Sequence, residues 1–216
     1  MSKKSKIYAG VASLLLVGAA TVAVAAPVVA APPGSFSVSL SPIPHDPAAD
    51  GGSNVTGSST LGLQGTRLTV NLTASGLSPN LPHLTHIHGV LQARNECPTL
   101  AADKPRNGGD GNGLIDTLEG QPAYGPILVT FSTRGDTSAA AGFKLSTASV
   151  ADAAGNLTYS RTFKIPQKIA AELSDLHVVV HGLDLNGSHA YDGEESSLGM
   201  GIPLEAELPV ACGPIN

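Results

Sequence analysis

The stretch Leu68-Thr-Val-Asn-Leu72, in which apolar and polar side chains alternate, decides the fold class. Alternation with a period of two places every second side chain on one face of a β-strand, so that one face is buried and the other meets water. The same period recurs on both sides of this stretch, in residues 36–40, 127–131, 157–165, 178–180 and 204–208. The sequence therefore predicts an all-β protein.

Turn-forming residues separate these segments. The 25 glycines and 16 prolines, with Asn and Asp between them, are typical of antiparallel strands joined by turns and long loops. We therefore expect a Greek-key β-sandwich or barrel with long loops. One short helix is expected at 166–173, where a proline suits the first turn and Ile169, Ala170 and Leu173 share a face. The glycine-rich residues 97–126 lack a strand pattern, and a loop of that length is more often functional than idle.

The N-terminus has the pattern of a secretory signal. Lys3, Lys4 and Lys6 precede an apolar run at 7–26 that carries no charge. We predict a signal peptide over residues 1–31, with cleavage after Ala25 or Ala31, and an uncleaved anchor as the alternative. Residues 32–216 then form a single β domain that is secreted, and either released or retained at the cell envelope.

Charge limits the choice of partners. The chain has 12 Lys and Arg against 17 Asp and Glu, and the signal removes three lysines and no acidic residue, so the mature net charge changes from -5 to -8. An acidic surface without a basic stripe argues against nucleic acid as a partner, and against a membrane surface after the signal is removed. Metal ions are the expected partners, and no oligomeric state is specified.

The chain has two cysteines, Cys97 and Cys212. In an exported protein the oxidising environment favours a disulfide between them over two free thiols. Closing a loop of that length stabilises a fold by roughly 4–5 kcal/mol in the chain-entropy model.

The histidines suggest a metal site. In the run His86-Ile-His88, a strand would point both rings to one face, about 6–7 Å apart. His181 ends an apolar run, so a neighbouring strand could add a third nitrogen and complete a site suited to copper or zinc. The alternative is that these rings cap strand ends through hydrogen bonds. His83 falls on the opposite strand face and His177 lies too far from His181 to share an ion, so both are expected to be structural.

Four segments together resemble the copper/zinc superoxide dismutases. His86-Ile-His88 resembles the copper pair of that family, and Cys97 stands nine residues beyond it, like the family's loop cysteine. The segment from Val179 to Asp184 resembles the later copper strand, and the ending Pro209-Val-Ala-Cys-Gly-Pro-Ile215 resembles the family's C-terminus. A turn at 152–156 is also similar. The resemblance implies the family's β-sandwich, with copper on His86, His88 and His181.

The chain departs from that family at two places. It has no histidine between His88 and His177, where the family's bridging and zinc ligands stand, so a complete zinc site is excluded on that pattern. Pro209 occupies the position of the arginine that guides superoxide. The chain is therefore more similar to the metal-poor relatives called CHRD domains. We expect a secreted metal-binding protein with weak or no dismutase activity, and an active copper-dependent superoxide dismutase is the alternative.

Two loops carry a pattern of calcium ligands. Residues 108–119, Gly-Gly-Asp-Gly-Asn-Gly-Leu-Ile-Asp-Thr-Leu-Glu, place oxygen donors at alternating positions and a glutamate last, as EF-hand loops do. The candidate ligands are Asp110, Asn112, Asp116 and Glu119. The first position is Gly108 instead of an aspartate, which implies either a weak site or a shifted geometry that uses Asn107.

Residues 184–195 repeat this spacing, with His189 in place of the usual glycine. The candidate ligands are Asp184, Asn186, Ser188, Asp192 and Glu195. In both loops the alternative is that Asp, Asn and Gly only build turns.

Overall fold

A computed structural model describes residues 33–46, 48, 53–93 and 95–216. The predicted signal peptide, residues 1–31, lies outside the described residues. Within the described residues, no helix has both the length and the apolar character needed to cross a membrane.

The described residues form a mostly β structure. Eight strands make one antiparallel sheet in the order β6-β5-β9-β10-β1-β2-β3-β8, and β4 pairs with β7 apart from it. The strands are β1 Gly34–Pro42, β2 Thr56–Gln64, β3 Arg67–Ser75, β4 Pro82–His83, β5 Thr85–His88, β6 Ile127–Thr130, β7 Ser149–Val150, β8 Leu157–Lys164, β9 His177–His181 and β10 Pro209–Pro214. Several neighbours, such as β5 with β9, are far apart in sequence. This confirms the predicted all-β fold with long connections.

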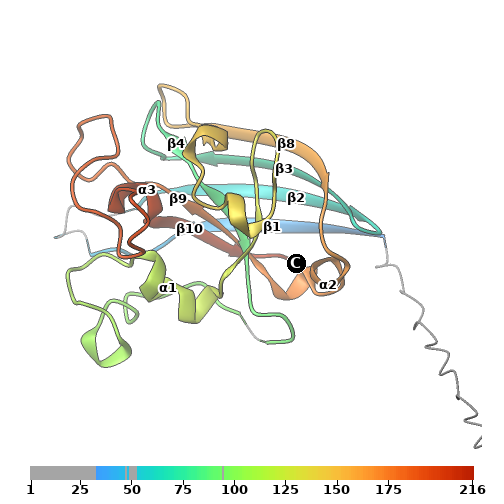
Figure 1. Cartoon of the computed structure of the whole chain (residues 1–216), viewed down its shortest axis with the longest axis horizontal. Helices are drawn as coiled ribbons and strands as arrows, with labels where there is room; N and C mark the ends of the chain where they lie inside the picture. The colour runs from blue at the N-terminus through green and yellow to red at the C-terminus, as the bar shows by residue number, and fades with distance from the viewer. Residues whose placement is uncertain (1–32, 47, 49–52, 94) are drawn as a thin grey trace, which may run out of the picture.

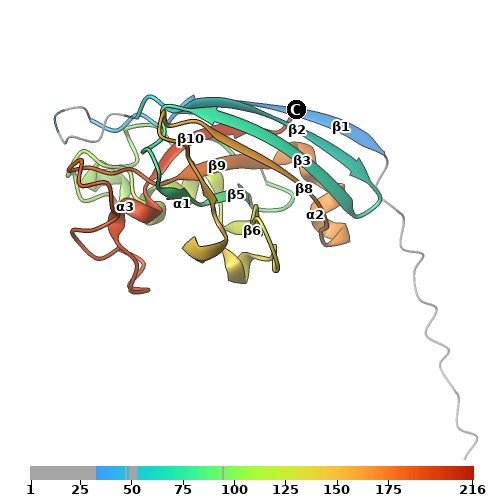
Figure 2. The same ribbon diagram turned by 90° about the horizontal axis from the view of Figure 1, so that it is seen from above.

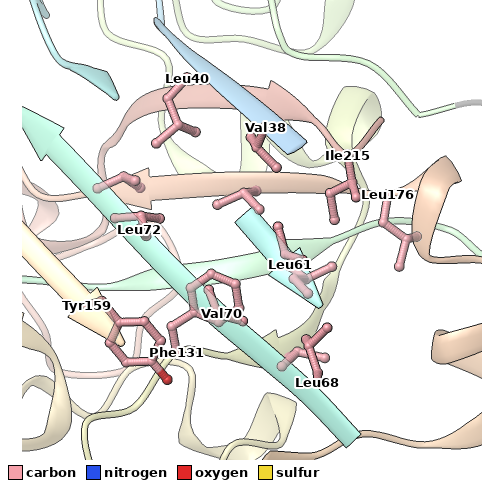
Figure 3. Packing of buried hydrophobic residues seen from close by; sticks show 14 of the residues in the cluster. Val38, Leu40, Leu61, Leu68, Val70, Leu72, Phe131, Tyr159, Leu176 and Ile215 are labelled. Atoms are coloured by element: carbon pink, nitrogen blue, oxygen red, sulfur yellow. The ribbon is translucent and has the colours of Figure 1, made fainter. Parts of the chain in front are cut away.

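The sheet curls so that its two halves face each other. The half with β1, β2, β3 and β8 arches over the half with β10, β9, β5 and β6 (Figure 1, Figure 2). Between them lies one apolar core, to which Leu61 and Val70 come from the first half and Ile87 and Val178 from the second. Figure 3 shows this packing, with the ring of Phe131 stacked on Tyr159 at 5.4 Å.

The alternation in β3 is confirmed. Leu68, Val70, Leu72 and Ala74 are buried, while the residues between them are exposed or half-buried. Strand β9 differs because all five of its residues are buried. Val178 and Val180 face the main core, and Val179 faces a second cluster under the long loop. Both faces of β9 are therefore covered, and the outer face is the one that carries the histidines.

The described helices are short: α1 Thr117–Tyr124, α2 Gln167–Ala171 and α3 Leu204–Glu207, with 3-10 turns η2 Pro105–Asn107, η3 Ala139–Ala141, η4 Leu145–Thr147 and η5 Leu173–Asp175. The helix expected at 166–173 is confirmed as α2 followed by η5. The strand expected at 204–208 is wrong, because this segment is α3. Its buried Glu205 accepts hydrogen bonds from the amides of Leu185 and Asp192, a role that a helical turn before β10 makes possible.

The long loop at 97–126 covers the outer face of β9 and β10 (Figure 1). Cys97 and Cys212 form the expected disulfide, with their Cα atoms 5.7 Å apart. Ile115 and Tyr124 of the loop pack with Val179 of β9 in a second, smaller core. The expectation of an irregular loop was incomplete, since α1 occupies eight of its residues.

Candidate metal centre

Strand pairing brings His86, His88 and His181 together. Ile87 of β5 points into the main core, so the rings of His86 and His88 point to the outer face of the sheet. Strand β9 pairs antiparallel with β5, with His86 opposite Val179, and this register places His181 on the same outer face. We call these three side chains the histidine trio.

One ring nitrogen from each member of the trio converges on a common point. These three nitrogens lie within 4.8 Å of one another. Nδ1 of His86 and Nε2 of His88 are 3.4 Å apart, and the three ring centroids are 4.9–5.5 Å apart. Nitrogens that bind one ion at about 2.0–2.1 Å each lie no more than about 4.2 Å apart. The 3.4 Å pair meets this limit, and the 4.8 Å bound places all three nitrogens within a small ring movement of one ion.

The other nitrogen of each ring is bound to a backbone carbonyl. The pairs are His86 Nε2 with Gly142 O at 2.8 Å, His88 Nδ1 with Gly125 O at 2.9 Å, and His181 Nδ1 with Glu207 O at 2.7 Å. A carbonyl oxygen only accepts, so each of these outer nitrogens carries the proton. In a neutral ring the inner nitrogen then has a free lone pair. Metal-bound histidines are held by outer hydrogen bonds of this kind.

The environment keeps the rings neutral. Burial, with the His181 ring as a second cause, lowers the pKa of His88 to about 3. Burial lowers the pKa of His181 to about 4. The pKa of His86 is also well below its ordinary value, first because of burial and then because of the two neighbouring rings. At neutral pH all three inner nitrogens are therefore available as ligands.

The three imidazoles of the trio fit a soft or borderline metal ion, either monovalent or divalent. Nε2 of His181 is buried and has no hydrogen-bond partner, a costly arrangement that an ion at the trio would relieve. Three neutral imidazoles suit copper or zinc better than calcium or magnesium, which prefer oxygen. The trio is therefore a candidate metal-binding site.

The trio is closed to solvent. Its three side chains are at most 1 % exposed. The ring of Tyr124, from α1, packs edge-on against His88 at 4.6 Å, and the ring of Phe143 lies 6.4 Å from His86. This burial would shield an ion on the trio from bulk water and from dissolved anions.

Two further buried histidines have both ring nitrogens within hydrogen-bond distance of backbone atoms. His83 Nδ1 and Nε2 each lie 3.0 Å from a carbonyl oxygen, of His181 and Ser78 respectively, and the neutral ring donates to one of the two. His45 bonds the carbonyl of Pro209 and accepts from the amide of Ile115. These rings therefore have a structural role, as expected for His83. His177 lies across from His88 in the strand register but is not part of the trio.

In the first acidic loop the structure assigns different roles to the four predicted ligands. Asp110 and Glu119 lie close together, with a third carboxylate, Asp103. Asn112 donates to Asp110 Oδ2 at 3.0 Å. Asp116 is the N-cap of α1, where it forms a capping box with Glu119.

In the second acidic loop the predicted ligands bond to one another and to the backbone. Asp184 accepts from the amides of residues 187–189, and Asn186 donates to Asp192 at 2.7 Å. Ser188 donates to a backbone carbonyl and Glu195 accepts from the amide of Gly201. Among the described residues, this loop contributes to no group of three acidic or histidine ligands. Calcium binding here stays a prediction.

Sequence patterns did not identify every residue around the histidine trio and the first acidic loop. Asp103 lies outside the twelve-residue pattern, and the outer hydrogen bonds of the trio come from backbone carbonyls that no side-chain motif marks.

No protein-family model matches the sequence, and no curated protein does so either. The function of the trio is therefore inferred from its geometry.

Proposed function

We propose that this chain is a secreted metal-binding protein of the superoxide dismutase-like (CHRD-like) kind, which holds one copper or zinc ion on the histidine trio. The observation that carries the proposal is that the two nitrogens of each ring have different partners. The outer nitrogen donates to a backbone carbonyl and the inner nitrogen faces the other two. A trio that only capped strands would not need three lone pairs aimed at one point.

A bound copper ion would supply one-electron redox chemistry, and a bound zinc ion would supply a fixed positive charge. The chain's own residues hold the ion and exclude water from it. The carbonyls of Gly125, Gly142 and Glu207 fix the orientation of each ring, and Tyr124 covers His88. Retention of an ion is thus the task for which this site is best arranged.

Efficient dismutase activity is not part of the proposal. Superoxide is an anion and would have to reach rings that are at most 1 % exposed, in a chain of formal net charge -5. The resemblance also lacks the guiding arginine, whose position is held by Pro209, and the histidines of the long loop. We therefore place metal retention ahead of turnover.

The test is the metal content of the mature protein, purified from an exporting host without chelators. We expect about one copper or zinc per chain in the wild type and in His189→Asn, which removes an exposed histidine outside the trio. His181→Gln, and the variant with Gln at all three trio positions, should lose the ion while keeping the disulfide and the β-sheet circular dichroism. Equal metal in all variants, or none in a wild type incubated with copper and zinc, would refute the proposal.

A dismutase assay on the copper-loaded wild type then separates the two functional alternatives. We expect activity close to that of controls that contain buffer without protein. Turnover that disappears in His181→Gln and persists in His189→Asn would establish the enzyme instead.

A further inference from the structure

A buried carboxylate lies beside the first acidic loop. The side chain of Asp103 is 0 % exposed. Its Oδ1 accepts from the amide of Gly113 at 3.1 Å, and its Oδ2 has no hydrogen-bond partner. The nearest cation is Lys104 Nζ, 3.6 Å from Oδ2 on a side chain that is 48 % exposed. A buried carboxylate oxygen without a hydrogen-bond donor, 3.6 Å from the ammonium of a half-exposed lysine, would be stabilised by a closer positive charge.

Asp103 faces two more carboxylates. One oxygen each from Asp103, Asp110 and Glu119 lie within 4.8 Å of one another. Like charges this close repel one another. Three carboxylates held together in this way are the arrangement that a divalent cation would stabilise.

The surrounding chain is shaped to keep these oxygens together. Gly109 packs against the backbone of Asp103 so closely that a side chain there would collide with it. Gly111 and Gly113 have φ values of 79° and 91°, which favour glycine, and they turn the loop back towards Asp103. The side-chain oxygen of Asn112 also lies in this turn, where it accepts from the amide of Leu114.

The donors are all oxygen, and they come from a loop. Hard cations take such ligands, and calcium accepts six to eight of them in flexible geometry, whereas magnesium demands a near-ideal octahedron. The pattern at 108–119 lacks an acidic residue at its first position, Gly108. Asp103, five residues earlier in the chain, brings a carboxylate into the same cluster.

We propose that Asp103, Asp110 and Glu119 bind a calcium ion, with Asp103 supplying the carboxylate that the loop pattern lacks at Gly108. This site is separate from the histidine trio, and its failure would leave the copper or zinc proposal untouched. Because Glu119 lies in the first turn of α1 and forms a capping box with Asp116, the ion also braces the start of that helix.

The test is a calcium titration of the full mature chain after removal of divalent ions with EGTA, followed by calorimetry. We expect about one calcium per chain, a calcium-dependent rise in melting temperature, and no comparable effect of magnesium at the same concentration. Asp103→Asn keeps the size of the side chain and should weaken binding at least tenfold. Asp136→Asn removes an exposed carboxylate outside both acidic loops, so it is the matched control and should bind like the wild type.

Asp110→Asn provides a second variant if Asp103→Asn does not fold, because Asp110 is exposed. It too should weaken calcium at least tenfold. No binding by the wild type at millimolar calcium would overturn the proposal. So would wild-type affinity in a folded Asp103→Asn, or an equal loss of binding in Asp136→Asn.

Discussion

The histidine trio and the acidic cluster of Asp103, Asp110 and Glu119 are two candidate ion sites built in opposite ways. The trio stands on paired strands, where register sets the position of each ring, and it is almost fully buried. The acidic cluster stands on a loop, where glycines and a disulfide-linked segment set the positions, and Asp110 is exposed. The trio is neutral at pH 7 without an ion, while the acidic cluster brings three carboxylates together beside one lysine, Lys104.

An ion would therefore act differently on the two regions. The trio is already organised by its outer hydrogen bonds, so an ion adds binding energy to a preformed site. The carboxylates of the acidic cluster repel one another and are held in place by backbone hydrogen bonds, so an ion would relieve that repulsion. The two regions should therefore differ in their response to acid, to loss of the disulfide and to each other's ligand.

The largest effect is expected from acid on the metal-free protein. The folded-state pKa values of His88 and His181 are about 3 and about 4, below the unfolded value near 6.5, so their contribution to stability is present above pH 6.5 and is lost as the pH falls towards 4. Each contributes a slope of at most about 1.4 kcal/mol per pH unit, and because the slope is smaller near each pKa the pair loses about 6 kcal/mol between pH 6.5 and 4.

Glu119 should act with the opposite sign. Its folded-state pKa is raised, mainly by burial, so protonation favours the folded state and its contribution to stability is present below pH 4.5 and lost as the pH rises. Urea unfolding in a chelator between pH 4 and 7 measures the sum, and Glu119→Gln should make the loss in acid steeper. A free energy of unfolding that does not change over this range would contradict the assignment of the trio as buried and neutral.

The second effect is loss of the disulfide. Cys97→Ser with Cys212→Ser should lower the free energy of unfolding by roughly 4–5 kcal/mol, because the bond closes a loop with a sequence separation of 115. The strands that carry the trio keep their pairing, whereas the loop that carries Asp103 loses its anchor. We therefore expect calcium affinity to fall by a larger factor than zinc affinity, both measured by calorimetry under conditions where the variant is folded. Equal losses would show that the trio depends on the loop as much as the acidic cluster does.

Much of the fold can be predicted from local sequence patterns, and the errors of that prediction also have local causes. The alternation at 68–72 identifies β3 because one face of that strand is buried and the other is exposed. Strand β2 went unpredicted because Gly, Ser and Thr make up much of it and only Leu61 and Leu63 mark its buried face near one end. The segment 204–208 alternates like a strand but forms α3, since buried Glu205 and Glu207 bond to backbone amides of distant loops.

The sequence predicts only those parts of the site that depend on the period of a strand and on the pairing register of neighbouring strands. The spacing of His86 and His88 places both rings on one face of any strand. His181 lies beside these two rings only because β5 pairs with β9, and the sequence suggested that pairing only through the family resemblance. Asp103 had no signal at all, because its burial arises from tertiary packing against Gly109 and Gly113.

The smallest effect is a coupling between the two regions through α1. The acidic cluster holds the first turn of this helix through Glu119, and the last turn ends beside His88, whose Nδ1 donates to Gly125 O. Thr117 of the same helix donates its hydroxyl to Glu207 O at 2.8 Å, and that carbonyl also accepts from His181. Calcium should therefore steady two of the three carbonyls that orient the trio.

Removing calcium should accordingly weaken zinc binding at the trio by a few-fold, less than the roughly 10–100-fold that loss of an outer-shell partner costs outright. Thermodynamic linkage makes the effect reciprocal, so saturating zinc must strengthen calcium binding by the same factor. Calorimetry of each ion in the presence and absence of the other measures both sides of this equality. In Asp103→Asn the zinc affinity should equal that of the calcium-free wild type and no longer respond to added calcium. Zinc affinities that are identical with and without calcium would show that α1 is rigid on its own and that the two regions act independently.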